Sequence, residues 1–231
     1  PRSSRPSRVR CNKPAPRPRM RFDVVTLFPE LFAPFMEAGV ARRAYASGQI
    51  DLKLWNLRDF AEGNYRRVDD RPFGGGPGMV MLAEPLARCL QAIQAERADA
   101  APVVLFSPIG AALNHAAVER WSAGAGAVLI CGRYEGIDQR FIDAHVTHQI
   151  SLGDFVLSGG EIAALALLDA VARLQPGVLN DEGSHQADSS NPAVHGLLDC
   201  PHYTRPEEWA GQRGPAELLS GHHAQSERWR R

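Results

Sequence analysis

The sequence predicts an α/β domain with a largely parallel sheet and helices on both faces of that sheet. From Met20 onward, short apolar runs alternate with segments that carry apolar residues at helical spacing. Glycine-bearing turns follow several of these runs, at the points where strands should end. Such alternation of strand and helix is typical of folds in which the strands lie parallel.

The first half of the domain contains two predicted strands and two predicted helices. Residues 22–28 form an apolar run typical of a buried strand, and residues 50–57 alternate apolar and polar side chains, which predicts a strand with one covered face. Residues 29–47 predict a helix, with a proline at its first position and a glycine after its end. A second helix is predicted over residues 82–97, after a long polar loop.

The second half continues the alternation. Apolar runs predict strands over residues 103–106, 127–131 and 149–157. Helical spacing predicts helices over residues 114–122, 136–145 and 161–174. The last of these is the most strongly helical segment of the chain, and the helix over 136–145 is expected to begin at its glycine.

The two ends of the chain differ in composition from the domain, which we expect to span residues 20–178. Residues 1–19 hold seven basic and no acidic side chains, so we expect a disordered basic tail before a natural start at Met20. Residues 179–188 are rich in polar and turn-forming residues and predict a flexible linker. Residues 189–231 predict a small helical domain, which we expect to be shortened because no helix-ending signal follows it.

Composition argues against a generally basic nucleic-acid binder, a membrane protein and a disulfide-rich protein. The chain has 26 basic and 26 acidic residues, and without the tail 19 basic residues face 26 acidic ones, so any contact with nucleic acid must rest on local patches. No apolar run approaches the roughly 18 residues that a membrane span needs. Cys11, Cys89, Cys131 and Cys200 lie far apart, which favours reduced thiols over a disulfide scaffold. We therefore expect a cytoplasmic protein without a membrane segment.

Three glycine-bearing segments lie where strands should end. They are SPIG at 107–110, CGRYEG at 131–136 and LGDFVLSGG at 152–160. In open α/β sheets, ligands bind beyond the carboxyl ends of the strands, so three such loops can hold a nucleoside. Each glycine is also explained as an ordinary turn residue. Because neither GxGxxG after the first strand nor GxxxxGK[ST] occurs, a standard dinucleotide or phosphate-loop site is disfavoured.

Four longer strings identify a family. DDRPFGGGPGMV at 69–80, CGRYEGID at 131–138, GDFVLSGGE at 153–161 and LLDCPHYTRP at 197–206 strongly resemble the bacterial tRNA (guanine-N1)-methyltransferases of the SPOUT superfamily. The resemblance starts at Met20 and extends in order to about Arg230. It implies methylation of guanine N1 in tRNA, at the guanosine 3′ of the anticodon, with S-adenosylmethionine as methyl donor. It also implies a C-terminal trefoil knot in the α/β domain and a homodimer whose subunits share their active sites.

The resemblance also implies a catalytic pair. Guanine N1 carries a proton at neutral pH, so its methylation needs a base near N1 and a cation or N–H donor near O6. By resemblance the base is Asp188 and the cation is Arg173. Taken alone, Asp188 is explained as a solvated loop carboxylate, and Arg173 as a favourable charge at a helix C-terminus.

The methyl donor is expected to bind to the three glycine-bearing segments. By resemblance, its contacts are Ser107, Pro108, Gly132, Tyr134, Glu135, Leu152, Gly153, Asp154, Phe155, Val156, Leu157, Gly159 and Gly160. The two last glycines are expected to allow close approach of the backbone. Glu135 is equally well explained as a charge at a helix N-terminus.

Candidate RNA contacts combine aromatic and basic side chains. They are Arg71 in the glycine-rich loop and His202, Tyr203 and Arg205 near the C-terminus, because an aromatic ring beside cations can stack on a base and bind phosphate. Such a cluster is also explained as a structural corner. A zinc site at Cys200, His202, His222 and His223 has the wrong spacing for common tetrahedral sites. A requirement for magnesium is implied only by the family resemblance.

Two rival functions stay open. One is a catalytically idle RNA-binding module of the same fold, against which the retained Asp188 and Arg173 argue. The other is a different nucleotide-using α/β enzyme such as an oxidoreductase, against which the missing dinucleotide fingerprint argues.

Overall fold

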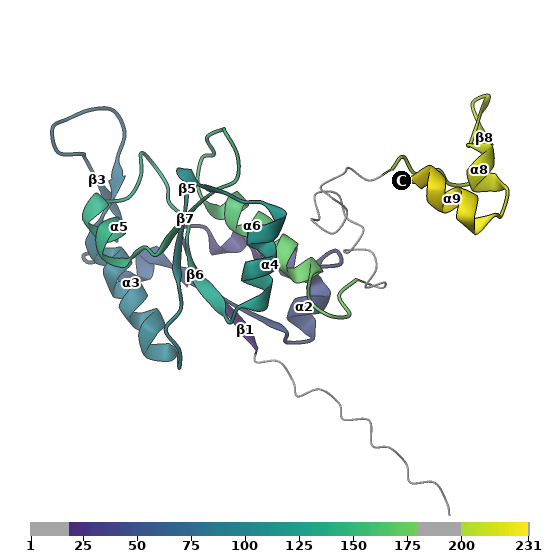
Figure 1. The fold of residues 1–231 in the computed structure, drawn as a ribbon. Coiled ribbons are helices and arrows are strands. Elements are labelled where there is room, and N and C mark those ends of the chain that lie inside the picture. The colour runs from purple at the N-terminus through teal and green to yellow at the C-terminus, as the bar shows by residue number, and fades with distance from the viewer. Residues whose placement is uncertain (1–18, 180–199, 231) are drawn as a thin grey trace, which may run out of the picture.

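The computed structural model describes residues 19–179 and 200–230. Its centre is a five-stranded sheet in the order β2-β1-β6-β5-β7, with every pair of neighbours parallel (Figure 1). The strands are β1 (Met20–Thr26), β2 (Ile50–Asn56), β5 (Val103–Ala112), β6 (Gly126–Ile130) and β7 (His148–Ser151). This confirms the predicted α/β class with a parallel sheet.

Helices cover both faces of the sheet (Figure 1). One face packs against α1 (Ala33–Glu37), α2 (Arg42–Ala46), α4 (His115–Ala123) and α6 (Glu161–Arg173). The other packs against α3 (Ala83–Glu96) and α5 (Gln139–His145). Each face has its own apolar core, because side chains along a buried parallel strand point alternately to the two faces.

The predicted helix over residues 29–47 is wrong as one element. The chain forms a 3-10 turn, η1 (Pro29–Leu31), and then the two short helices α1 and α2. Pro34 has no N–H to continue the hydrogen-bond ladder from η1. Gly39, between α1 and α2, has a φ of 68°, which ends helical geometry.

The predicted strand over residues 103–106 is too short. β5 continues to Ala112, and Phe106 and Ala111 both pair with Ile150 of β7, so residues 107–110 bulge out of the ladder. A Cβ on Gly110 would lie 2.5 Å from the backbone of β7, so only glycine fits there. The SPIG segment is therefore a bulge within a strand, not a turn beyond its end.

Two further boundaries differ from prediction. Helix α5 does not begin at Gly136, which has a φ of 141°; Asp138 is its N-cap and accepts from the Arg140 amide at 3.0 Å. The last strand, expected over 149–157, ends at Ser151. There the Ser151 hydroxyl donates to the Gly153 carbonyl at 3.0 Å and replaces the ladder with a turn. Residues 152–157 are thereby released from the sheet.

The remaining elements are small. η2 (Leu57–Phe60) follows β2, and β3 (Asp69–Asp70) pairs antiparallel with β4 (Val80–Met81). Between β3 and β4 the glycine-rich loop carries Phe73, which is 97% exposed. Residues 200–230 contain the hairpin of β8 (Glu208–Trp209) and β9 (Gln212–Arg213), then α8 (Ala216–Leu219) and α9 (His223–Arg230). The tail, most of the predicted linker and residues 189–199 lie outside the described residues, so the domain boundaries stay predictions.

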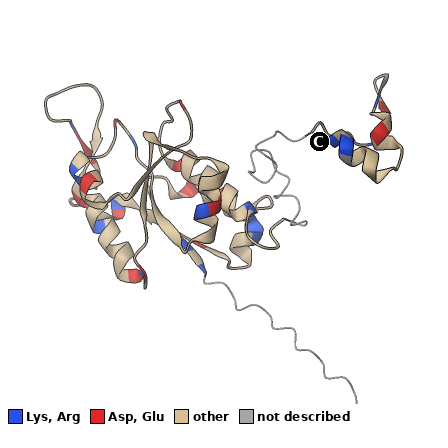
Figure 2. Cartoon of the chain, in the orientation of Figure 1, with Lys and Arg blue, Asp and Glu red and all other residues tan. Residues whose placement is uncertain are grey.

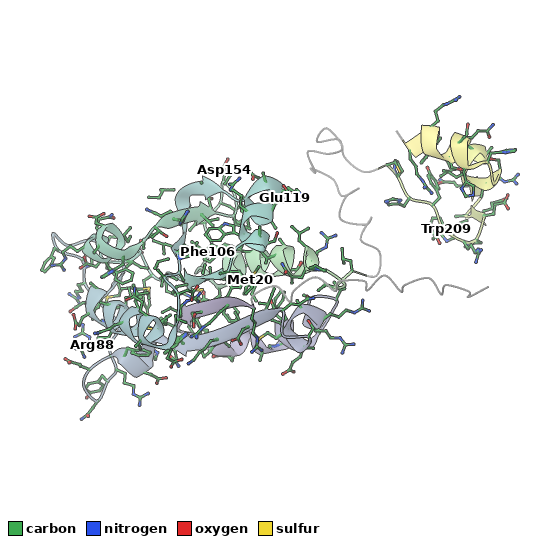
Figure 3. The ribbon with its side chains drawn as sticks, turned by 60° about the horizontal axis from the view of Figure 1, so that its bottom comes forward. Met20, Arg88, Phe106, Glu119, Asp154 and Trp209 are labelled. Carbon is green, nitrogen blue, oxygen red and sulfur yellow. The ribbon has the colours of Figure 1, made fainter. Side chains whose placement is uncertain are left out.

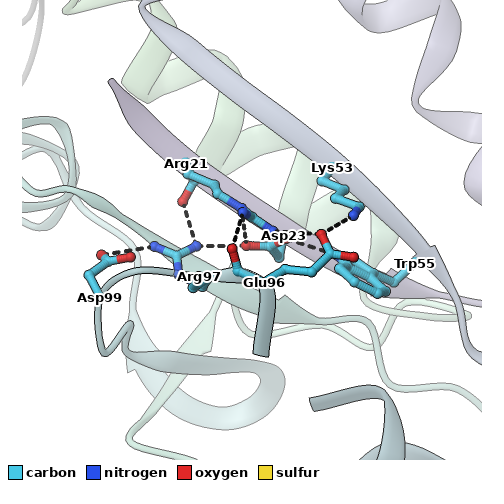
Figure 4. Close-up of polar contacts among 7 residues, drawn as sticks. All are labelled: Arg21, Asp23, Lys53, Trp55, Glu96, Arg97 and Asp99. Carbon is cyan, nitrogen blue, oxygen red and sulfur yellow. Dashed lines mark hydrogen bonds and ion pairs between the residues drawn. The ribbon is translucent and has the colours of Figure 1, made fainter. Parts of the chain in front are cut away.

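A buried group of charges joins the amino-terminal half of β1 to the end of α3 (Figure 4). We call Arg21, Asp23, Trp55 and Arg97 the β1–α3 ion cluster. The Asp23 carboxylate is fully buried and accepts from Arg97 Nη1 at 2.6 Å, Arg21 Nη2 at 2.8 Å and Trp55 Nε1 at 2.8 Å. Three donors compensate the cost of burying this carboxylate, so the cluster fixes the end of α3 against the sheet.

Candidate functional site

A cavity of about 500 Å³ opens at the carboxyl ends of β5, β6 and β7. This is the edge of the sheet at which α/β proteins bind ligands. Eleven of the thirteen residues predicted to contact the methyl donor line it. They are Ser107, Pro108, Gly132, Tyr134, Glu135, Leu152, Phe155, Val156, Leu157, Gly159 and Gly160. The structure therefore gathers three separate sequence segments around one space.

Gly153 and Asp154 do not line the cavity. The turn made by Ser151 carries them away from it, and the ring of Phe155 covers Gly153, where a Cβ would lie 2.5 Å from Phe155 Cε1. Asp154 lies at the surface of the domain, whereas Phe106 lies in its interior (Figure 3). The turn was not predicted, because the strand was expected to continue past it.

The cavity combines an apolar interior with a polar opening. Leu105, Ile137 and Ile142 line it from β5, the loop after β6 and α5. Ser107, Glu135 and Gln139 add polar side chains, and the loops add backbone N–H and C=O groups. A flat heterocycle with polar edges matches such a lining, because its faces need apolar contact and its edges need hydrogen bonds.

The loop after β6 is held in a strained shape by the segment before α3. Tyr134 has a φ of 61°, which is uncommon for a residue with a side chain. The Glu135 amide donates to the Met79 carbonyl at 2.9 Å, and the Met81 amide donates to the Gly136 carbonyl at 2.9 Å. A Cβ on Gly78 would lie 2.3 Å from Glu135 Oε1. The GGGPGMV segment thus fixes Glu135 at the rim of the cavity.

An ion pair that sequence analysis did not single out lies beside the cavity. Glu161, the first residue of α6, is 1% exposed and pairs with Arg133 Nη2 at 2.9 Å. Its Oε1 accepts from Thr26 Oγ1 at 2.8 Å. We call Thr26, Arg133 and Glu161 the pocket-side ion cluster. The sequence offered only one signal for this pair: Arg133 and Glu161 each follow a glycine, the first in the string CGRYEGID and the second in GDFVLSGGE.

Gly159 and Gly160 serve the packing of the protein itself. A Cβ on Gly159 would lie 2.2 Å from Arg133 Nε, and one on Gly160 would lie 2.8 Å from Cys131 Cα. The Gly160 amide donates to the Gly132 carbonyl at 2.9 Å. Burial raises the pKa of the Cys131 thiol well above its usual value, so this side chain is a neutral core residue. At Gly160 the backbones of the two loops therefore lie close together, while the expected approach to the methyl donor stays a prediction.

The structure describes only one member of the predicted catalytic pair. Asp188 lies outside the described residues. Arg173 is the last residue of α6, whereas Ala163 near the start of α6 lines the cavity. Ten residues of helix separate them by about 15 Å. Arg173 is therefore remote from the cavity of its own chain.

The predicted RNA contacts lie outside the cavity. Arg71 is exposed in the loop after β3. Tyr203 is half-exposed and contacts the Trp229 ring edge-on, with ring centres 5.8 Å apart. Acidic and basic residues are interspersed over the α/β domain, and α9 ends with Arg228 and Arg230 (Figure 2). His202 and Arg205 are exposed like Tyr203 and belong to the same described segment.

The described residues give no support for a metal site or for a membrane-spanning helix. Among residues 19–179 and 200–230, no three His, Cys, Asp or Glu side chains gather as a metal site. This includes Cys200, His202, His222 and His223, so the zinc hypothesis gains no support. No helix within these residues is both long and apolar enough to cross a bilayer.

Comparison with known proteins decides the family. The family model described as "tRNA (Guanine-1)-methyltransferase TrmD" matches residues 20–231. The chain belongs to this family. The predicted resemblance is confirmed, and membership of the tRNA (guanine-1)-methyltransferase family argues against the oxidoreductase alternative.

Relatives in this family match the chain over most of its length. A tRNA (guanine-N(1)-)-methyltransferase of Polaromonas sp. is 76% identical over 217 residues, which is 92% of this chain and 83% of the relative. One of Paracidovorax citrulli is 74% identical over 216 residues, covering 92% and 85%. The crystal structure of the tRNA (m1G37) methyltransferase from Aquifex aeolicus matches with a TM-score of 0.75 at 39% identity, covering 91% and 87%.

Proposed function

We propose that this protein transfers a methyl group from S-adenosylmethionine to N1 of guanine 37 in tRNA, on the 3′ side of the anticodon. One observation carries the proposal. Three segments, two of them family strings, converge on one cavity at the carboxyl edge of the sheet. The position in tRNA is taken from the activity of the Aquifex aeolicus relative.

The cavity suits the proposed donor. Its volume of about 500 Å³ falls within the range of small-molecule sites, roughly 300–1,000 Å³. The apolar side chains of Leu105, Ile137 and Ile142 suit the faces of an adenine ring, and loop backbone groups suit its edges and the ribose. When bound, S-adenosylmethionine supplies an electrophilic methyl group on its sulfonium. The loops hold that group in line with the attacking nitrogen, and such fixed geometry is worth about 7–11 kcal/mol in rate.

Two side chains are proposed to act on the guanine, one on its N1 proton and one on the negative charge that develops on O6. Asp188 removes the N1 proton, and Arg173 stabilises the negative charge that spreads to O6. Arg173 is about 15 Å of helix beyond Ala163. Arg173 can therefore contact a guanine bound at a cavity only if that cavity belongs to a second copy of the chain.

We propose a homodimer with shared active sites, which would satisfy this requirement for Arg173. The uncovered side of α6 carries apolar side chains and one acidic one: Ile162 is 55% exposed, Leu165 and Ala166 are half-buried, and the half-buried Asp169 lies between them and the end of the helix. Arg173 ends the same stripe, since positions 162, 165, 166 and 173 share one helical face. Covering this stripe with a second copy would bury the apolar side chains and carry Arg173 to the partner's cavity.

The remaining family expectations are part of the proposal. We propose that the loops of the cavity belong to a trefoil knot and that residues 189–231 form a small tRNA-binding domain joined by the linker 179–188. The proposed RNA contacts are Arg71 in the α/β domain and His202, Tyr203 and Arg205 in the small domain. A cytoplasmic location fits a tRNA substrate, and magnesium remains an expectation of the family.

Calorimetric titration tests the donor site. We expect S-adenosylhomocysteine to bind at one site per chain and NAD not to bind. Binding of NAD without binding of S-adenosylhomocysteine would exclude a methyl-donor site and would favour an enzyme that uses a dinucleotide. Methylation of an unmodified tRNA transcript separates an active enzyme from an idle RNA-binding module of the same fold.

Substitution of the proposed base tests the chemistry. We expect Asp188→Asn to lower turnover at least 100-fold, the usual scale of a lost general base, while S-adenosylhomocysteine affinity stays within about twofold. Single-turnover kinetics and calorimetry on the same preparation measure both quantities. Near-normal turnover in the variant would show that another group removes the proton.

A further inference from the structure

The pocket-side ion cluster joins three elements that meet beside the cavity. Thr26 is the last residue of β1, Arg133 follows β6, and Glu161 begins α6. Glu161 accepts from Thr26 Oγ1 at 2.8 Å and from Arg133 Nε at 3.2 Å, and its other oxygen pairs with Arg133 Nη2 at 2.9 Å. The guanidinium thus makes one hydrogen bond to the carboxylate and a second contact at ion-pair distance, so the two groups are held at short range.

The Arg133 guanidinium also contacts the loop that contains Ser158. Arg133 Nη1 donates to the Ser158 carbonyl at 3.1 Å, and the guanidinium lies 4.5 Å from the centre of the Phe28 ring. Gly159 leaves room for this side chain, since a Cβ there would lie 2.2 Å from Arg133 Nε. Arg133 is therefore surrounded by contacts to Glu161, Ser158, Phe28 and Gly159.

Arg133 and Ser158 line the cavity together with the residues that flank them. Gly132 and Tyr134 flank Arg133, and Leu157 and Gly159 flank Ser158; all four line the cavity. The spacing of the two loops therefore depends on the side chain between them. An error of about 1 Å in such spacing is enough to impair a site that holds reactants in line.

We propose that Arg133 is a positioning residue for the methyl donor: through Glu161 and Ser158 it sets the distance between the two loops that enclose the donor. This inference rests on the proposed function of the cavity. Arg133 acts through the loop backbones and is not proposed to touch the reacting atoms. Its effect should appear in the binding of the donor and not in that of tRNA.

The test is the variant Arg133→Lys. A lysine ammonium keeps the charge but cannot meet both Glu161 oxygens and the Ser158 carbonyl in the fork geometry of arginine. We expect S-adenosylhomocysteine to bind about tenfold more weakly, the scale of one lost charge-assisted hydrogen bond. The KM for S-adenosylmethionine should rise by a similar factor, while the KM for tRNA stays within about twofold.

Arg97→Lys is the matched control. Arg97 is a buried arginine with a buried carboxylate partner, but it belongs to the β1–α3 ion cluster. This control should lower the thermal unfolding midpoint and leave donor affinity within about twofold. Wild-type donor affinity in Arg133→Lys, or equal weakening in both variants, would overturn the proposal. Failure of the wild-type protein itself to bind S-adenosylhomocysteine would instead refute the proposed function.

A milder variant covers the case in which Arg133→Lys does not fold. Thr26→Val keeps the shape of the side chain and removes the hydroxyl, which donates to Glu161 and accepts from the Phe28 amide at 3.0 Å. Thr26 does not itself line the cavity. We expect donor affinity to fall about threefold, a part of the net value of a hydrogen bond. Unchanged affinity in this variant would also count against a positioning role.

Discussion

The two buried ion clusters of the α/β domain use the same chemistry for different purposes. In each, an arginine holds a carboxylate that is almost completely buried: Arg97 with Asp23, and Arg133 with Glu161. Asp23 and Thr26 project from β1 to opposite faces of the sheet, three residues or about 10 Å apart. The β1–α3 ion cluster joins elements within a core. The pocket-side ion cluster joins two loops that enclose a cavity.

The difference shows that burial and pairing alone do not reveal a role in function. A buried pair is costly to break wherever it lies, because a charge then stays without its partner. What distinguishes the two clusters is the neighbouring residues, which are core side chains in one case and cavity walls in the other. Loss of the first should therefore appear in stability alone, and loss of the second in ligand affinity as well.

Removal of Arg97 should have the largest effect on stability. Arg97→Met leaves the Asp23 carboxylate with Arg21 and Trp55 only, and breaking a buried pair costs about 3–5 kcal/mol. Urea denaturation should show this loss as a lower midpoint. Below that midpoint, S-adenosylhomocysteine should bind as in the wild type. Weakened binding in folded protein would show that the two clusters are not separate.

A methyl group at Gly160 should affect both stability and binding. In Gly160→Ala the Cβ would lie 2.8 Å from Cys131 Cα, and since backbone cannot yield easily, we expect a loss of roughly 1–3 kcal/mol together with weaker donor binding. Gly124→Ala is the control, because the closest atom there is 3.5 Å away. If both alanine variants bind the donor equally well, the contact between the two loops does not shape the cavity.

The smallest effect is expected at an exposed pair. The Asp138 side chain caps α5 and contacts Arg140, so Asp138→Ala should cost about 1 kcal/mol of stability and leave donor affinity unchanged. Hydrogen bonding from Arg140 lowers the pKa of Asp138 to about 2. The cap should therefore stabilise the protein fully above about pH 4 and lose its contribution as the pH falls towards 2. Wild-type and variant unfolding curves should converge over that range; a constant difference would show that charge is not involved.

Local patterns were sufficient to predict most of the sheet. The apolar runs gave β1, β2 and β6 to within two residues, and the amphipathic segments gave α3, α4 and α6. These predictions succeeded because burial on both faces imposes continuous apolar runs on parallel strands. Eleven of the residues that the family resemblance assigned to the methyl donor line the cavity, and eight of them lie in the family strings.

Features that depend on tertiary contact were not predicted. The break between η1 and α1 follows from Pro34 and that between α1 and α2 from Gly39; both residues were visible in the sequence but were outweighed by the helical spacing around them. The end of β7 at Ser151 depends on a single hydroxyl bond to Gly153. The role of Arg133 could not be predicted, because its partners Phe28 and Glu161 are far from it in sequence.

The most direct measurement of the proposed activity is a single-turnover reaction of the purified protein with labelled S-adenosylmethionine and an unmodified tRNA transcript that carries guanosine 37. Nuclease digestion and mass spectrometry should find 1-methylguanosine at that position and no methyl transfer to a transcript with adenosine there. Transfer to another nucleotide, or none to guanosine 37, would contradict the assignment of the cavity as the site at which a methyl group meets this base.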